Sequence, residues 1–383
     1  MRARLSLKVP EFCVDYEDSK KAVMRKKIQY LVIASILLAN SCSGLQASPL
    51  TATIPSSVRK SASLKAQWGP GDLLAATSGG IEVFRATATT PYLTFHRKFA
   101  SAIALDHSNN LYAMSSNEVD EFAVGATKPV RTIRVPSGNL ISIALDRHDN
   151  LYVADAFYDP ATGIDGEILV YGPSGTSPIR TITKGIAIFS SDPGGVAFDQ
   201  SGYLYVLNGI GCPPGSSGCS PYTASVSVYP PGRIIPVRNF AVFSPTSLAL
   251  DHQNYLYVAN TDNQVEIFAP GGTTPTRVIS SAKGPINPIA VDSTDHLYVG
   301  VGTSVTVYAA NQSRVLRTLR LPKSKAFEQV HVIALDNSQN VYVGVNAFSG
   351  LSFVAVFKSH TSRLERQLSI PSGDVVDLAV TPP

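Results

Sequence analysis

The chain repeats one short pattern of apolar and polar residues six times. Each copy consists of an apolar residue, Ala, a second apolar residue and Asp, followed by a polar turn and a Leu-Tyr or Val-Tyr pair. The copies begin at Ile103, Ile143, Val196, Leu248, Ile289 and Ile333. A continuous apolar run is typical of a strand buried on both faces, and Asp accepts hydrogen bonds from the backbone that follows it in turns. Each copy therefore predicts two antiparallel strands joined by a hairpin.

Two further strands are predicted in each unit. One is an alternating run that ends on an aromatic residue, and the other follows a Pro/Gly turn and contains Arg. We expect the aromatic residues to pack between neighbouring sheets, and the arginines to keep the outer strands from pairing with other chains. The aromatic residues are Phe84, Phe122, Tyr171, Tyr229, Phe268, Tyr308 and Phe357, and the arginines are Arg131, Arg180, Arg238, Arg277 and Arg317.

Four antiparallel strands in a unit of about forty or more residues are typical of a propeller blade. The first set of strands, residues 73–95, lacks an innermost strand, and residues 377–380 form a strand left over at the C-terminus. The sequence therefore predicts an all-β fold. It is a seven-bladed β-propeller of four-stranded antiparallel blades, with the ring closed by pairing the C-terminal strand with the N-terminal blade.

The recurring Asp has two interpretations, a turn residue or a calcium ligand. The dense Asp-x-Asp-x-Asp-Gly spacing of a calcium loop is missing, and each Asp belongs to a different unit. The residue three positions later tolerates a left-handed backbone in five of the six turns. These residues are Asn109, Asp149, Gly202, Asn254 and Asp295, with Gln339 as the departure. We therefore interpret the Asp as a turn residue.

The N-terminus has the features of an export signal. Arg25, Lys26 and Lys27 precede the apolar run 28–39, which is short for a membrane span. Met24 is a second candidate initiator, because the residues before it are polar. Cleavage after Ser41 leaves either Cys42 as a lipidation site or an ordinary secreted protein. We expect a signal peptide at 1–41, a flexible linker at 42–70 and the propeller at 71–383; N-terminal sequencing tests this division.

Charge and cysteine content narrow the class of protein. The formal net charge is +4, but residues 1–41 hold eight Lys or Arg and four Asp or Glu, so the remainder is neutral. No basic stripe with interleaved aromatic residues is present, which argues against nucleic-acid binding. Cys212 and Cys219 bracket a Pro/Gly loop and predict a local disulfide in an exported protein.

One segment carries a family resemblance. The residues LALDHQNYLYVANTDNQVEIF, at 248–268, look very like one NHL unit. Over residues 72–380 the chain resembles the NHL-repeat propellers and the wider set that includes gluconolactonase-like and streptogramin-lyase-like proteins. The resemblance implies a propeller fold. It implies no single activity, because the family includes enzymes, binding modules and proteins of unknown role.

Polar residues at strand ends are candidates for a site. The second strands end at Thr77, Ser115, Asp155, Asn208, Asn260, Val301 and Val345, at the mouth of the channel where function usually lies in propellers. Asp155, Asn208 and Asn260 could ligate calcium or another divalent cation, as the related lactonases and lyases imply, or they could cap their strands. Further candidates in loops at this mouth are Asp192, Asn287, Glu328, His331 and Asp374.

No set of nucleophile, base and orienting residue can be traced in the sequence. Insertions at 157–166 and 209–222 enlarge loops on the same face and could contact a protein, peptide or glycan. We therefore expect an exported, non-enzymatic and monomeric propeller without a cofactor, which presents a binding face outside the cell, in the periplasm or as an envelope lipoprotein with a lipid anchor. The alternative is a metal-dependent lactonase or lyase with a cation at the channel mouth.

Overall fold

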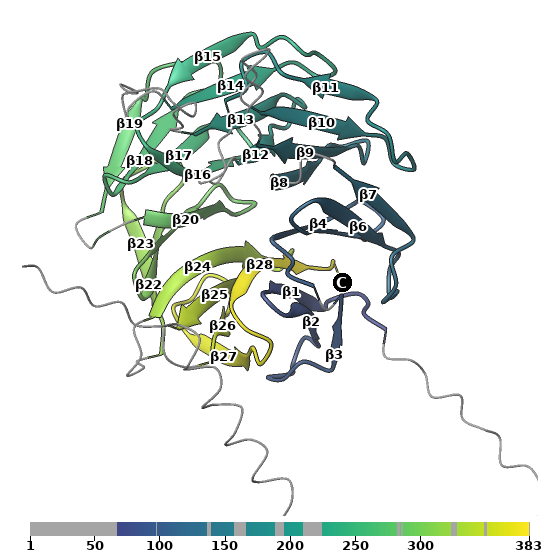
Figure 1. The fold of residues 1–383 in the computed structure, drawn as a ribbon. Coiled ribbons are helices and arrows are strands. Elements are labelled where there is room, and N and C mark those ends of the chain that lie inside the picture. Colours follow the sequence, from purple (N-terminus) through teal and green to yellow (C-terminus); the bar gives the residue numbers. More distant parts are fainter. Residues whose placement is uncertain are drawn as a thin grey trace, which may run out of the picture. The chain divides into compact units, whose positions relative to one another are not determined.

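A computed structural model describes residues 67–96, 98–135, 139–156, 166–187, 195–209, 224–281, 284, 286–322, 328–347 and 351–382. These residues form seven four-stranded antiparallel sheets, the blades of the propeller (Figure 1). Within the described ranges no helix is long and apolar enough to cross a membrane.

Each blade has four strands, named below from the innermost to the outermost. Blade 1 is β28 (Val375–Val380), β1 (Leu73–Thr77), β2 (Gly80–Phe84) and β3 (Leu93–Phe95), and blade 2 is β4 (Ala102–Leu105), β5 (Leu111–Met114), β6 (Glu118–Phe122) and β7 (Arg131–Arg134). Blade 3 is β8 (Leu140–Leu145), β9 (Leu151–Asp155), β10 (Glu167–Tyr171) and β11 (Arg180–Ile182), and blade 4 is β12 (Val196–Phe198), β13 (Leu204–Asn208), β14 (Ser225–Tyr229) and β15 (Arg238–Ala241). Blade 5 is β16 (Pro245–Leu250), β17 (Leu256–Asn260), β18 (Gln264–Phe268) and β19 (Arg277–Ser280), and blade 6 is β20 (Ile286–Val291), β21 (Leu297–Val301), β22 (Ser304–Tyr308) and β23 (Val315–Arg320). Blade 7 is β24 (Glu328–Leu335), β25 (Val341–Ala347), β26 (Phe353–Phe357) and β27 (Leu364–Ser369).

The C-terminal strand closes the ring as predicted. β28 pairs antiparallel with β1, from Leu73 opposite Val380 to Ala76 opposite Asp377. The inner strands β28, β4, β8, β12, β16, β20 and β24 contact one another in succession around the ring (Figure 1). Beyond the paired strands, the backbone N–H of Asp72 donates to Thr381 Oγ1 at 2.9 Å.

The recurring Asp is a turn residue, as interpreted from the sequence. Asp292, which is 1% exposed, accepts the backbone N–H groups of Thr294 and His296 on Oδ1, both at 2.9 Å, and the Tyr298 hydroxyl on Oδ2 at 3.0 Å. The third residue after each Asp has φ between 58° and 80°, and Gln339 adopts this left-handed conformation too. The Asp therefore satisfies the turn backbone, and in blades 4 to 7 it also accepts the hydroxyl of the following Tyr.

The predicted aromatic stack between sheets is confirmed. All seven aromatic residues that end the third strands are at most 8% exposed. Phe84 of blade 1, for example, packs with Tyr342 and Val354 of blade 7. One such large side chain is therefore buried between every pair of blades.

The expected role of the outer-strand arginines is corrected at three of the five. The Arg131 side chain is only 8% exposed, pairs with Glu121, and donates to the carbonyls of Gly172 and Gly175 in blade 3 at 2.9 and 2.8 Å. Arg238 and Arg317 likewise donate to a buried Tyr hydroxyl of their own blade. Arg131 therefore ties its strand to the next blade, and Arg238 and Arg317 tie theirs to a tyrosine of their own blade, so these three do not act as exposed charges that guard an edge.

Residues 67–70 belong to the packed part of the chain, although they lie in the segment expected to be a linker. Trp68 is 2% exposed and joins the core cluster between blades 1 and 2. Its Nε1 donates to the carbonyl of Ala126 at 2.9 Å. The boundaries of the predicted signal peptide and the rest of the linker lie outside the described residues.

Gly344 lies where blades 7 and 1 pack closely. A Cβ at this position would lie 2.5 Å from Val332 Cγ1 and 2.8 Å from Val375 Cγ1. Because β-branched side chains have little rotamer freedom, we expect Gly344→Ala to lower the free energy of unfolding by about 1–3 kcal/mol in chemical denaturation. Gly175→Ala is the control, since its Cβ would meet nothing closer than 3.6 Å. Equal stability of the two variants would contradict this packing.

Candidate functional site

The ring has two mouths with different chemistry. We call the end with the loops from second to third strands, and from fourth strands to the next blade, the loop mouth. The end with the Asp hairpins between first and second strands is called the hairpin mouth. Those candidate residues from the sequence that the structure describes lie at the loop mouth.

In blade 1, the end of the second strand, β1, holds the loop between β27 and β28. Thr77 Oγ1 and Ser372 Oγ lie 2.6 Å apart, and the Ser372 N–H donates to Glu82 Oε1 at 3.0 Å. Glu82 is 1% exposed, and burial raises its pKa against the lowering effect of the Ser372 bonds. Thr77 and Glu82 together fix the loop between blades 7 and 1.

In blade 2, Ser115 and Asp120 stand at the positions of Thr77 and Glu82 and likewise hold the loop that enters the blade. Ser115 Oγ lies 3.5 Å from His96 Nε2, and Asp120 Oδ2 lies 3.4 Å from His96 Nδ1. Burial lowers the pKa of His96, although Asp120 raises it. His96 has φ 48° and begins the loop into β4. Because the positions match Thr77 and Glu82 of blade 1, we interpret this Ser-His-Asp arrangement as a loop anchor.

Asn208 anchors a loop in blade 4. Its Oδ1 accepts the N–H of Ala187 at 2.9 Å, and its Nδ2 donates to the Gly185 carbonyl at 3.1 Å. Ser227, at the position of Asp120, donates to the same carbonyl at 2.6 Å. Asn208 therefore uses both ends of its amide inside its own blade and the loop that enters it.

Asn260 and Asp155 are the last residues of the second strands of blades 5 and 3. Asn260 Oδ1 accepts the backbone N–H groups of Asp262 and Gln264 at 3.1 and 3.0 Å, which caps its own hairpin. Asp155 is fully buried and pairs in register with Glu167, whose pKa is raised first by burial and then by Asp155. Capping, the alternative considered for these residues, is present at Asn260.

The cation site stays a prediction. Among the described residues there is no group of three or more His, Cys, Asp or Glu side chains that could hold a metal ion. Asp155, Asn208 and Asn260 include only one such residue, so their convergence on a cation is not tested by that result. Asp192, Cys42, Cys212 and Cys219 lie outside the described residues, as do the side chains of Asn287 and Glu328.

Blade 7 departs from the loop-anchor pattern. Apolar Val345 and Ala355 stand where blades 1, 2 and 4 carry polar anchors, and β24 and β25 are eight and seven residues long. Beside this long hairpin is a cavity of about 360 Å³, lined by Gln329, His331, Asn346, Ala347 and Asp374. Two of the residues singled out from the sequence, His331 and Asp374, therefore meet at the loop mouth.

The polar groups of this cavity are held in place by neighbours. His331 lies at an irregularity of β24, between Val330 and Val332, where the register shifts; such bulges redirect side chains at rims. Desolvation lowers the pKa of His331, while Asp374 raises it, so the neutral ring predominates at neutral pH. The Ser352 hydroxyl donates to Asp374 Oδ1 at 2.9 Å.

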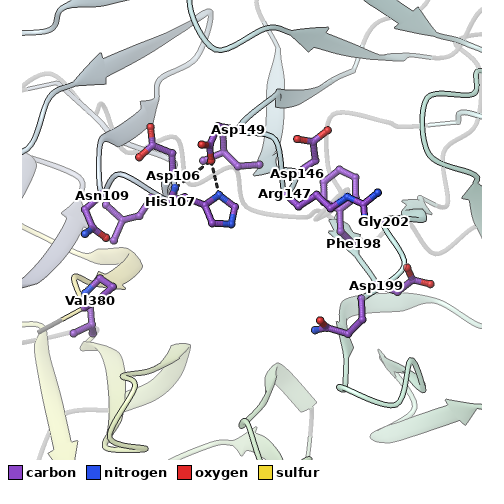
Figure 2. A pocket seen from close by; sticks show the side chains of 14 residues that line it. Asp106, His107, Asn109, Asp146, Arg147, Asp149, Phe198, Asp199, Gly202 and Val380 are labelled. Atoms are coloured by element: carbon purple, nitrogen blue, oxygen red, sulfur yellow. Dashed lines mark hydrogen bonds and ion pairs between the residues drawn. The ribbon is translucent and has the colours of Figure 1, made fainter.

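The hairpin mouth contains a larger cavity that sequence reasoning missed. It has a volume of about 530 Å³ and is lined by the hairpins of blades 2, 3 and 4 together with Val380 and Pro382 (Figure 2). The signal for it lies in the two variable positions of each Asp hairpin. These are the residue after Asp (His107, Arg147 and Gln200) and the residue two further on (Asn109, Asp149 and Gly202).

Comparison with solved structures supports the fold. No protein-family model matches the chain, and no curated protein matches it. Among solved structures it is similar to the β-propeller domain of Myceliophteria thermophila Cps50 (Swd1), with 11% sequence identity and a TM-score of 0.55. The similarity covers 73% of this chain and 92% of that domain. At this identity the likeness shows a β-propeller fold and nothing of the activity.

Proposed function

We propose that the protein is an exported, non-enzymatic propeller that binds a glycan at the loop mouth of blade 7. The single observation that carries the proposal is the cavity of about 360 Å³ beside β24 and β25. The NHL-like segment at 248–268 supports a place among NHL-type propellers, and the apolar run at 28–39 supports export.

The chemistry of the lining supports a hydroxylated ligand. A neutral imidazole at His331, a carboxylate at Asp374 and a carboxamide at Gln329 offer both donors and acceptors, which sugar hydroxyl groups match. No Lys or Arg lines this cavity among the described residues. A ligand with hydroxyl groups therefore fits better than an anionic one.

Glycan-array screening followed by isothermal titration calorimetry tests the proposal. We expect His331→Ala and Asp374→Asn each to weaken binding of the selected glycan about tenfold or more, because each removes hydrogen bonds from a partly enclosed site. His148→Ala, an exposed histidine of a hairpin, is the control and should bind as the wild type does.

Two results would contradict this function. One is unchanged glycan affinity in the His331→Ala protein, or no glycan binding by the wild type. The other is stoichiometric calcium or zinc that is lost in Asp155→Ala, together with turnover of a lactone, which would favour the metal-dependent enzyme.

A further inference from the structure

The cavity at the hairpin mouth has an apolar wall. Leu105, Leu145, Phe198 and Val380 line it and are only half-buried, so they present apolar surface to the opening. Phe198 is held by Tyr152 in an edge-to-face contact with ring centroids 4.8 Å apart. A volume of about 530 Å³ is in the range of pockets for small organic ligands.

Neighbouring hairpins are joined by a series of hydrogen bonds, and the series is broken at this cavity. The N–H of the residue after Asp donates to the side chain of the left-handed residue in the next blade. The bonds run from His107 to Asp149, from Gln200 to Asn254, from His252 to Asp295 and from Ser293 to Gln339. Gly202 has no side chain to accept from Arg147, whose guanidinium lies over the glycine instead.

One carboxylate at the cavity remains available. Asp106, Asp146 and Asp199 accept bonds from their own hairpins on both oxygens. Asp149 differs, because Oδ1 accepts from His107 at 3.1 and 2.7 Å while no described residue donates to Oδ2. Its side chain is 26% exposed and lies beside His107 at the open space (Figure 2).

The charge of the described lining is negative. The lining includes four aspartates, one arginine and one histidine. Arg147 carries the only permanent positive charge among these lining residues. Asp149, followed by Asp106 and Asp146, raises the pKa of His107. The negative charge of this lining attracts a cation. The apolar wall favours a cation with a hydrocarbon chain, which would be buried against it.

We infer that the hairpin-mouth cavity binds a primary organic ammonium ion. The ammonium group donates to Asp149 Oδ2, and the hydrocarbon part packs on the apolar wall of Leu105, Leu145, Phe198 and Val380. This site is separate from the glycan site of blade 7, since the two cavities share no residue.

Calorimetric titration with four probes that share a six-carbon chain tests the inference on the full propeller. Hexylammonium should bind at least fivefold more tightly than hexyltrimethylammonium, which cannot donate hydrogen bonds, and more tightly than hexanol or hexanoate. Asp149→Asn should weaken hexylammonium at least fivefold. Asn is compatible with this turn, because Asn254 occupies the matching position in blade 5 with φ 64°.

Two further variants keep the test decisive. Asp295→Asn is the matched control, because Asp295 accepts from His252 as Asp149 does from His107 but does not line the cavity. Gly202→Asn should restore the missing bond and reduce binding by filling the gap; its Cβ would lie no closer than 3.5 Å to any other group. The inference is overturned if hexanoate or hexanol binds as tightly as hexylammonium, if nothing binds, or if Asp295→Asn weakens binding as much as Asp149→Asn.

Discussion

Deletion of residues 374–383 is expected to abolish cooperative folding. The deletion removes β28, including buried Val375 and Leu378, and exposes the edge of β1. Burial of two such side chains contributes about 4 kcal/mol, and the lost strand pairing adds to this. A total near 5 kcal/mol or more approaches the whole stability of many proteins. Thermal unfolding followed by circular dichroism, with solubility on expression, measures the effect.

A rearranged chain provides the control for this deletion. Residues 374–380 can be moved in front of Leu73 and joined to it by the turn 251–255 of blade 5, because Val380 pairs with Leu73 as Leu250 pairs with Leu256 across that turn. Blade 1 then has a covalent hairpin like the other six blades, because Thr381 and Asp72 already lie within hydrogen-bond distance. We expect the rearranged protein to recover the melting transition. A deleted protein that melts like the full chain would contradict closure by β28.

Asp292→Ala is expected to give the second largest effect, a loss of about 4 kcal/mol in the free energy of unfolding. The substitution leaves the Tyr298 hydroxyl and two backbone N–H groups in the hairpin without their acceptor, and buried groups left unpaired cost about 1–3 kcal/mol each. Asp262→Ala is the control, since Asp262 is exposed in the neighbouring blade. Equal urea denaturation midpoints for the two variants would contradict the role of the hairpin Asp.

The same carboxylate predicts a dependence of stability on acid. Burial raises the pKa of Asp292, but hydrogen bonds from Thr294 and His296 outweigh burial and hold it below 3.8. A lowered pKa in the folded state stabilises the protein above pH 3.8, and this contribution is lost as the pH falls through the folded value. We expect Asp292→Asn to reduce the loss of stability below about pH 4 in urea titrations. An unchanged acid slope would exclude Asp292 as its source.

The fold followed from the sequence because its determinants are local and repeated. Asp at the hairpin, Tyr in the second strand and the aromatic residue at the end of the third strand recur in register, so each unit predicts its own hairpins and packing. Closure was predictable from the same count, since one unit lacked an inner strand and one strand remained. The role of Arg131, Arg238 and Arg317 was assigned wrongly, because only the structure shows their partners, such as the Gly172 carbonyl of the next blade for Arg131.

The bonding partners of the candidate residues could not be predicted from the sequence, for a physical reason. Asn208 and Ser115 are polar residues at strand ends, and the sequence does not distinguish a ligand from a group that holds a loop. That distinction depends on the partner, such as the Gly185 carbonyl, which lies more than twenty residues away in the chain. The hairpin-mouth cavity was missed because it arises from a glycine, Gly202, and from residues of three blades that meet only in the closed ring.

The hydrogen bonds between neighbouring hairpins affect where the ring can gain a blade during evolution. Since the donor is a backbone N–H and the acceptor lies in the next blade, a tandem duplication of blade 5 would offer each copy a suitable partner on both sides. A duplication at blade 4 would instead repeat Gly202 and interrupt the series twice. A duplicated blade 5 would therefore keep the series of bonds intact, whereas a duplicated blade 4 would not.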